Sequence, residues 1–252
     1  MNITWDAKGY TSGFAFVHQY GEGVLDLIDA APGSHIVDLG CGNGALSEKL
    51  IARGYRVTAI DASGDMLAQA RALHPDIPFV QADATDFTLP EPADAIFSNA
   101  VFHWIDRDRQ PLLAAAIARN LKPGGQLVCE FGGYGCAERV HSALERAFAA
   151  RGLVYPRVFY FPTIAQHAPI LEEAGLCVTY AVLFDRPTPQ VGADGLKNWI
   201  HMFVKTPFEG MAADMREAII AEAVDSLRET LCREDGTWIV DYVRIRIKAV
   251  KV

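Results

Sequence analysis

Short apolar segments alternate with segments of helical spacing through the first half of the chain. Patterns typical of buried strands cover residues 35–39, 55–60, 79–81, 93–98 and 126–131. Helical patterns lie between them at about 45–53, 63–74 and 108–120, and Ser63 is the expected N-cap of the second helix. Strands that alternate with helices of this length predict an α/β protein with a doubly wound, mostly parallel sheet.

The pattern changes after residue 132. Helical spacing continues at 136–151 and 163–174, and a strand is expected at 177–184. A proline-containing loop and two helices, at about 193–204 and 211–232, then interrupt the alternation before a last strand at 238–250. We therefore expect three parts, which are an N-terminal helical flap (1–30) with a helix from Val24 to Ala31, a main α/β domain (31–185 and 237–252), and an inserted helical lid (186–236).

The composition narrows the class of protein. Of the 252 residues 50% are hydrophobic, and 31 Asp and Glu outnumber 23 Lys and Arg, which gives a formal charge of −8 without a basic cluster. A nucleic-acid substrate is therefore not expected. Because no apolar run approaches the ~20 residues of a membrane span and no leader pattern begins the chain, we expect a soluble cytoplasmic protein without a membrane partner. The sequence indicates no particular oligomeric state.

The cysteines do not indicate a metal site. There are five, an odd number without C-x-x-C spacing or a nearby histidine at metal-ligand intervals: Cys41, Cys129, Cys136, Cys177 and Cys232. We expect them to be reduced thiols that pack as small hydrophobic side chains, and we expect no bound metal.

A glycine turn after the first strand is the strongest candidate for a ligand site. Asp38 lies in that strand, and Gly40, Gly42 and Gly44 let the backbone turn tightly into a helix that begins near Ala45. A helix entered through such a turn presents free backbone N–H groups to a ligand. The glycines also fit the looser dinucleotide fingerprint, so NAD and S-adenosylmethionine both remain open on this pattern alone.

Polar residues at the ends of the following strands help to choose between these cofactors. Asp61, Asp83 and Asn99 end the second, third and fourth strands, and ligands of open α/β sheets bind outside those ends. Asp61 suits the ribose of either cofactor. Carboxylates at Asp38 and Asp83 disfavour a pyrophosphate and suit a cationic ligand, although singly Asp38 could bind local N–H groups and Asp83 could cap a turn. As an ordered set they favour S-adenosylmethionine.

Five motifs resemble those of the class I S-adenosylmethionine-dependent methyltransferases. They are Val37–Gly44, Ala59–Ser63, Met66–Arg71, Gln81–Ala84 and Leu121–Gly125. The segment Phe97–Ile105 is similar to that of trans-aconitate 2-methyltransferases and of the malonyl-carrier-protein methyltransferases of biotin synthesis, and the C-terminal insertion is more similar to the former group. At positions where that resemblance leads us to expect arginines for a polycarboxylate, this chain has His201 and Thr206, and Lys205 or Arg157 could supply the charge.

The resemblance implies a Rossmann-like, seven-stranded sheet whose last strand (239–250) runs antiparallel beside 177–184, and it assigns S-adenosylmethionine binding to the main domain. It places Gly40, Gly42 and Asn99 near the methionine part, Asp61 on the ribose, Met66 against the adenine and Asp83 on the adenine amine. The expected cofactor-binding residues are Asp38, Gly40, Gly42, Asp61, Ala62, Met66, Asp83, Ala84 and Asn99.

The methyl acceptor is expected to be a small molecule, with O-methylation of a carboxylate as one candidate reaction. A carboxylate needs no general base at pH 7, whereas a hydroxyl or thiol would benefit from a histidine, for which His103 and His18 are the candidates. The expected substrate pocket consists of Tyr10, Phe102, His103, Trp104, Trp199 and His201. Packing in the core is the alternative role for these side chains. A nicotinamide-dependent oxidoreductase and a non-catalytic cofactor-binding protein of the same fold are the alternative functions.

Overall fold

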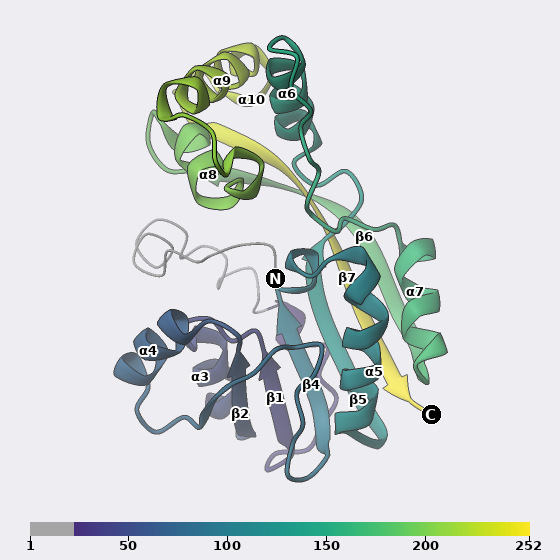
Figure 1. Cartoon of the computed structure of the whole chain (residues 1–252). Coiled ribbons are helices and arrows are strands. Elements are labelled where there is room, and N and C mark those ends of the chain that lie inside the picture. Colours follow the sequence, from purple (N-terminus) through teal and green to yellow (C-terminus); the bar gives the residue numbers. More distant parts are fainter. Residues whose placement is uncertain (1–22) are drawn as a thin grey trace.

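The computed structural model of the chain describes residues 23–252, and its centre is a seven-stranded sheet with the order β3-β2-β1-β4-β5-β7-β6 (Figure 1). The strands are β1 (His35–Leu39), β2 (Arg56–Asp61), β3 (Phe79–Gln81), β4 (Ala93–Asn99), β5 (Leu121–Gly132), β6 (Leu176–Gln190) and β7 (Trp238–Lys251). Strands β1 to β5 pair in parallel, and β7 runs antiparallel between β5 and β6. The predicted fold class and the antiparallel last strand are therefore confirmed.

Helices cover both faces of the sheet. The α-helices are α3 (Ala45–Ala52), α4 (Gly64–Leu73), α5 (Gln110–Asn120), α6 (Glu138–Ala149), α7 (Ile164–Glu173), α8 (Gly195–Phe203), α9 (Ala213–Ser226) and α10 (Arg228–Leu231). Three short 3-10 helices are η1 (Phe102–Trp104), η2 (Arg107–Arg109) and η3 (Thr206–Phe208). Helices α3 and α4 pack on one face of the strands β1 to β3, and α5 and α7 pack on the other face (Figure 1).

The alternation of side chains along the strands explains these two layers. In β1, Val37 and Leu39 join the apolar cluster under α5, whereas Ile36 joins the cluster under α3. Ser63 caps α4 as predicted, because its Oγ accepts a hydrogen bond of 3.3 Å from the backbone N–H of Met66. This cap fixes where α4 begins and therefore where the Met66 side chain lies.

A second, helical body lies beyond one end of the sheet (Figure 1). The long strands β6 and β7 extend into it, and helices α6, α8, α9 and α10 pack around their far halves. Helix α6 packs against α9, so a helix from the predicted main domain joins the helices of the predicted lid. Whether these helices move as a lid stays a prediction.

Several predicted boundaries differ from the structure. The strand expected at 126–131 is the second half of β5, which begins at Leu121, and the helix expected at 211–232 is divided into α9 and α10. The strand expected at 177–184 continues as β6 to Gln190, through Pro187 and Pro189. Because β6 is the edge strand of the sheet, a proline there need not remove a hydrogen bond of the ladder. The helix expected from Val24 to Ala31 is wrong in extent, since only residues 23–25 are helical within the described part of that segment.

The rest of the predicted N-terminal flap, residues 1–22, lies outside the described residues. Among the helices that the structure describes in residues 23–252, none combines the length and the apolar character that crossing a membrane requires.

Candidate functional site

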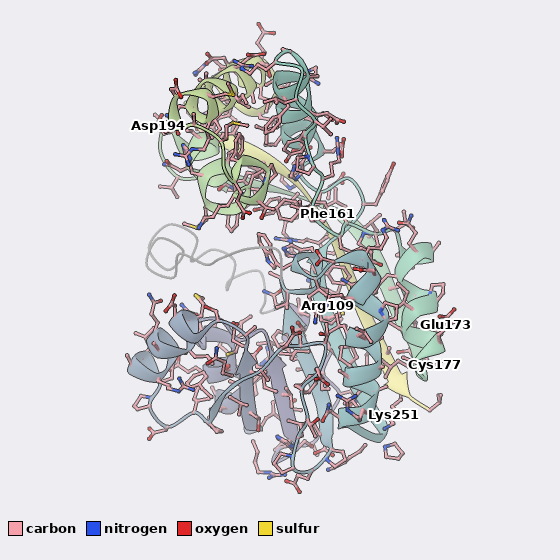
Figure 2. The ribbon with its side chains drawn as sticks, viewed as in Figure 1. Arg109, Phe161, Glu173, Cys177, Asp194 and Lys251 are labelled. Carbon is pink, nitrogen blue, oxygen red and sulfur yellow. The ribbon has the colours of Figure 1, made fainter. Side chains whose placement is uncertain are left out.

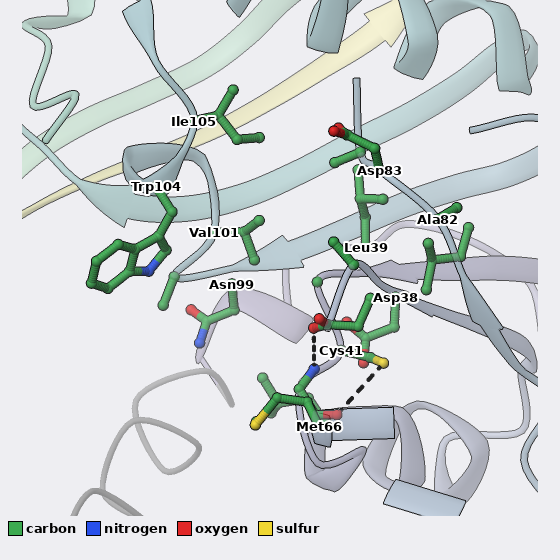
Figure 3. A pocket seen from close by; sticks show the side chains of 18 residues that line it. Asp38, Leu39, Cys41, Met66, Ala82, Asp83, Asn99, Val101, Trp104 and Ile105 are labelled. Atoms are coloured by element: carbon green, nitrogen blue, oxygen red, sulfur yellow. Dashed lines mark hydrogen bonds between the residues drawn. The ribbon is translucent and has the colours of Figure 1, made fainter. Parts of the chain in front are cut away.

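The first cavity of the site lies where the strand order reverses, at the carboxyl ends of β1 and β4 (Figure 3). It contains roughly 900 Å³ of empty space, part of which is open to solvent. All nine residues that the sequence analysis expects at the cofactor line this cavity: Asp38, Gly40, Gly42, Asp61, Ala62, Met66, Asp83, Ala84 and Asn99. The carboxyl ends of the parallel strands therefore bring these residues together in space, as the sequence predicts.

The glycine turn is held in a conformation that side chains would prevent. Gly40 has φ +80°, and a Cβ atom built on it would lie 2.1 Å from Cγ2 of Val101. The backbone N–H groups of Gly40 and Cys41 both donate to the carbonyl oxygen of Ile60, at 2.7 and 3.0 Å. The turn thus lies against β2 and leaves bare backbone at the cavity wall.

Asp61 joins this turn to the start of α4. Its Oδ2 accepts a hydrogen bond from the backbone N–H of Gly42 at 2.9 Å, and its Oδ1 accepts one from the backbone N–H of Ser63 at 2.8 Å. Burial raises the pKa of Asp61 above its ordinary value, against the lowering effect of these two hydrogen bonds. Each oxygen keeps a further lone pair for a ligand.

Asp38 is the most deeply buried carboxyl group at this cavity, with 2% of its surface exposed. Its Oδ2 accepts a hydrogen bond of 2.6 Å from the hydroxyl of Ser47. Burial raises the pKa of Asp38 to about 7, and the nearby charge of Asp61 acts in the same direction. A cationic ligand would stabilise the ionised form of both carboxyl groups.

Asp83 lies across the cavity and is held in a different way (Figure 3). Its Oδ1 accepts hydrogen bonds of 2.8 Å from both the backbone N–H and the hydroxyl of Thr85, and its Oδ2 is 3.1 Å from Nη2 of Arg109. Burial alone would raise the pKa of Asp83, but these hydrogen bonds and the arginine charge lower it below its ordinary value. Asp83 is therefore ionised at neutral pH, and its position is fixed by its neighbours.

A second cavity adjoins the first and shares Ala100 and Trp104 with it. It contains about 500 Å³ of empty space and is lined by Ala100, His103, Trp104, Cys136, Ala137, His141, Phe159, Phe161, Trp199, Phe203, Tyr242 and Arg244. Figure 2 shows Phe161 between the sheet and the helical body, and the cavity takes residues from both parts.

The backbone of the second cavity is strained at two points. Within residues 23–252, Ala100 and Ala137 are the two non-glycine residues with positive φ, at 61° and 53°, and both line this cavity. Such conformations persist only where surrounding structure enforces them, and they cluster at functional sites. At Ala100 the backbone N–H donates to the carbonyl oxygen of Glu130 at 2.7 Å, which holds the turn after β4 in place.

His103 is a buried neutral histidine that lines the second cavity. Its Nδ1 accepts a hydrogen bond of 3.2 Å from the backbone N–H of Gly132. The hydrogen of the neutral ring is therefore on Nε2. Burial, and then the charge of Arg244, lower the pKa of His103 well below its ordinary value.

Arg244 is a buried cation in β7, with 8% of its surface exposed. Its guanidinium lies 4.6 Å above the ring of Tyr242, and it has no ion pair or side-chain hydrogen bond within the part of the chain from residue 23 onward. Its neighbour Arg246 instead pairs at 2.7 Å with Glu130, which also pairs with Arg186. Buried charges are normally paired, so Arg244 is an exception among the described residues of β7.

Some predicted pocket residues lie elsewhere. Phe102 packs in the core, with ring centroids 5.2 Å from Phe131 and 6.1 Å from His167. His201 lines a third cavity beside α8 and α9, 3.4 Å from Glu217. Of the predicted pocket residues, His103, Trp104 and Trp199 line the second cavity, whereas Tyr10 and His18 lie outside the described residues.

Neither candidate for the missing arginine charge lines the second cavity. Arg157 pairs with Glu138 at 2.6 Å and with Glu145 at 2.9 Å, and Lys205 lines the third cavity. The second cavity also contains residues that were not predicted from the sequence: Arg244, Tyr242, His141, Phe159 and Phe161. Only the alternation of β7 could have drawn attention to Arg244 and Tyr242, which fall on the same face of that strand.

Comparison with known proteins places the chain among methyltransferases. A family model described as a methyltransferase domain matches residues 36–125. An uncharacterised methyltransferase of Schizosaccharomyces pombe is 31% identical over 98% of this chain and 98% of its own length. A trans-aconitate 2-methyltransferase of Rhizobium etli is 26% identical over 99% of this chain and 100% of its own length.

A solved structure has the same fold. It is geranyl diphosphate C-methyltransferase of Streptomyces coelicolor in complex with magnesium, geranyl diphosphate and S-adenosyl-L-homocysteine. It aligns with a TM-score of 0.55 and 18% identity, over 93% of this chain and 79% of that chain.

Proposed function

This chain belongs to the class I S-adenosylmethionine-dependent methyltransferases, and we propose that it methylates a carboxylate oxygen of a small molecule. Membership of this family decides against the nicotinamide-dependent oxidoreductase that the glycine turn left open. The relatives include proteins named trans-aconitate 2-methyltransferase, whose substrate carries carboxylates. The second cavity of this chain supports a carboxylate acceptor through its own residues.

The first cavity suits the cofactor, because three carboxyl groups line it together with the bare backbone of the turn at Gly40 and Gly42. Asp38, Asp61 and Asp83 would hold the cationic and hydrogen-bonding parts of the molecule, and Met66 would lie against its adenine. When bound, S-adenosylmethionine supplies a methyl group that its sulfonium activates for displacement. The remaining tasks of the chain are to orient the acceptor and to exclude water.

The single observation that carries the carboxylate proposal is Arg244 in the adjoining cavity, which has no ion pair among residues 23–252. Arg244 and His103 flank Gly132, since Arg244 is the strand partner of that residue and His103 accepts its N–H. A guanidinium and an imidazole Nε2–H are both hydrogen-bond donors. An acceptor with a carboxylate would satisfy both donors and neutralise the buried charge.

The state of His103 also supports an acceptor that is already ionised. A general base needs an unprotonated nitrogen for the acceptor, but Nδ1 of His103 is occupied by the Gly132 N–H, and Nε2 carries the hydrogen. A lowered pKa makes this ring a weak base in addition. His103 would therefore donate a hydrogen bond that orients a carboxylate, which needs no base at pH 7.

We further propose that the helices of residues 186–236, together with α6, act as the lid over the acceptor. Trp199 and Phe203 from α8 and His141 from α6 line the second cavity opposite the residues that follow β4. Water excluded by these side chains would strengthen the electrostatic interaction between Arg244 and the acceptor.

The test is a methylation assay with labelled S-adenosylmethionine and a panel of small carboxylic acids, alcohols and amines. A methyl ester releases labelled methanol in mild alkali, whereas a methyl ether or methylamine does not. We expect alkali-labile label on carboxylic acids only. Label that is stable to alkali, or equal labelling of alcohols and amines, would contradict carboxylate O-methylation.

A further inference from the structure

Aromatic rings form most of the wall of the second cavity. Phe159 and Phe161 are stacked, with an interplanar angle of 4° and centroids 5.3 Å apart. Trp104 lies edge-on to Phe159 at 5.1 Å, and Trp199 lies 5.5 Å from Phe203. Flat aromatic walls of this kind favour a flat, apolar ligand body, which can stack on them without hydrogen bonds of its own.

The described lining of the same cavity contains a single cation. Arg244 is the only lysine or arginine among its lining residues within 23–252, and that lining contains no aspartate or glutamate. One guanidinium can pair with one carboxylate. Further carboxylates on the same ligand would be buried among aromatic rings without a partner, which is strongly unfavourable.

A third feature lies on α6. His141 is 3% exposed, and its Nδ1 is 2.7 Å from the hydroxyl of Tyr155, but its Nε2 has no hydrogen-bond partner among the described residues. Burial lowers the pKa of His141 to about 4, so the ring is neutral at pH 7. A buried polar atom of this kind is normally paired, and here a polar but uncharged group on a ligand would pair with it.

Together these features define the acceptor more closely than the carboxylate alone. We propose that the second cavity binds an aromatic monocarboxylic acid, with its carboxylate at Arg244 and His103, its ring among Trp104, Phe159 and Trp199, and a hydroxyl or similar uncharged substituent near His141. This assignment rests on the carboxylate O-methylation proposed above. It differs from the tricarboxylate named for several relatives of this chain.

The reaction balances without a base or a further reactant. One carboxylate oxygen forms a bond to the methyl carbon as the bond from that carbon to sulfur breaks. The electron pair of the broken bond stays on sulfur, which becomes a neutral thioether. The ionised acceptor has no proton to release, so the products are a methyl ester and S-adenosylhomocysteine.

Binding can be tested without methyl transfer. The full-length protein is saturated with S-adenosylhomocysteine, and benzoate, 4-hydroxybenzoate and trans-aconitate are titrated in by calorimetry. We expect 4-hydroxybenzoate to bind at least 10-fold more tightly than trans-aconitate, and more tightly than benzoate. His141→Ala should remove the preference for 4-hydroxybenzoate over benzoate. Tighter binding of trans-aconitate than of either aromatic acid would overturn the proposal.

Charge variants locate the binding site. Arg244→Gln should weaken binding of 4-hydroxybenzoate at least 30-fold, Arg244→Lys should restore part of it, and Lys205→Gln, which removes a charge at the third cavity, should leave it unchanged. Unchanged binding in Arg244→Gln would overturn the proposal. If Arg244→Gln no longer binds S-adenosylhomocysteine, the proposal is tested instead by Arg244→Lys and by the ranking of the three acids on the wild-type protein.

Failure of the inference and failure of the proposed function give different results. If 4-hydroxybenzoate binds at Arg244 but S-adenosylmethionine yields no alkali-labile product, the acceptor assignment is supported and carboxylate O-methylation fails. If trans-aconitate is converted to an alkali-labile ester and the aromatic acids do not bind, O-methylation stands and the aromatic monocarboxylate is wrong.

Discussion

Asp61 and Gly42 are joined by a hydrogen bond of 2.9 Å, from the backbone N–H of the glycine to Oδ2 of the carboxylate. The other oxygen of Asp61 accepts the backbone N–H of Ser63, the N-cap of α4. One side chain at the end of β2 therefore fixes both the glycine turn and the start of α4, and both segments line the first cavity. A ligand bound there depends on Asp61 twice, through direct contact and through the shape of the wall.

Replacing Asp61 should therefore remove cofactor binding. In Asp61→Ala two backbone N–H groups and the ligand lose a charged acceptor, and we expect the affinity for S-adenosylmethionine to fall at least ~100-fold, which is about 3 kcal/mol. Calorimetry measures this change. Asp86→Ala, which removes an exposed carboxylate paired with Arg119 at 3.8 Å, is the control and should bind normally. Undiminished affinity in Asp61→Ala would refute this site.

Gly40→Ala should destabilise the protein more than the same substitution at a glycine that has a similar backbone conformation but open space at its Cβ position. Gly33 has φ +85° and nothing within 4 Å of a built Cβ atom, so Gly33→Ala should cost only the strain of the left-handed conformation, about 1–2 kcal/mol. Gly40→Ala has the same strain and also overlaps Val101, which should cost about 1–3 kcal/mol more.

Urea denaturation of both variants measures this difference. Gly40→Ala combined with Val101→Ala should recover part of the loss, because the nearest clash is with Cγ2 of Val101. Equal destabilisation by Gly33→Ala and Gly40→Ala would mean that the close approach of Val101 does not constrain the turn.

Asp38 should make both stability and cofactor binding depend on pH. Its pKa in the folded protein is about 7, above the ordinary value of 3.8, so between these values the folded state holds a proton that the unfolded state has lost. The free energy of unfolding of the cofactor-free protein should therefore fall as the pH rises through this window, by up to about 4 kcal/mol from this group.

Denaturation at pH 5 and pH 8 checks this sign. Asp38→Asn keeps an acceptor for Ser47 but does not ionise, so its stability should fall less than that of the wild type between these two pH values. Binding of the cationic cofactor favours the ionised carboxylate, and we expect a proton to be released on binding near pH 6.5. Calorimetry in buffers of different ionisation enthalpy measures that proton, and an equal release in Asp38→Asn would assign it to another group.

The sequence predicted the first cavity well and the second poorly, for a physical reason. Asp38, Asp61, Asp83 and Asn99 follow strands of a parallel sheet, and the topology of such a sheet brings strand ends together wherever the intervening helices lie. The proximity of these strand ends therefore follows from the order of the strands and helices along the chain.

The position of Arg244 at the second cavity cannot be predicted from the order of the elements. Alternating apolar and charged residues in β7 are typical of a half-exposed strand, but β7 lies between β5 and β6 and continues into the helical body. Arg246 is compensated by Glu130 of the neighbouring strand, whereas Arg244 meets a cavity. The difference depends on which residues of α6, α8 and β5 lie opposite, and one strand cannot predict it.

Trp199 should affect the acceptor and not the cofactor. Its indole N–H donates to the hydroxyl of Tyr242 at 2.5 Å, and it lines only the second of the two adjoining cavities. Trp199→Ala removes this contact and a large part of the aromatic wall, so the KM for the acceptor should rise at least about 10-fold, the effect of roughly 1.4 kcal/mol. The affinity for S-adenosylmethionine, measured by calorimetry, should change little. Loss of cofactor affinity alone would count against the position of the acceptor.

Substitutions of His103 should show whether this residue acts as a hydrogen-bond donor or as a general base. Asn at position 103 keeps an acceptor near the Nδ1 position for the N–H of Gly132 but loses the donor at Nε2, whereas Gln keeps a donor near Nε2. If His103 orients a carboxylate by donation, His103→Gln should retain more activity than His103→Asn, which should lose roughly 10–100-fold in turnover, the effect of a hydrogen bond to a charged group. Cofactor affinity should remain close to that of the wild type in both.

The pH profile separates the two roles of His103 further. Because burial and Arg244 lower the pKa of His103 well below its ordinary value, the ring stays neutral from pH 6 to 8, and its titration should add no limb to the turnover profile in that range. A base catalyst would instead give a rate that falls with acid as the ring protonates, and His103→Gln would abolish that fall. A limb near pH 6.5 that disappears in His103→Gln would show that His103 removes a proton, and the acceptor would then be a hydroxyl or a thiol.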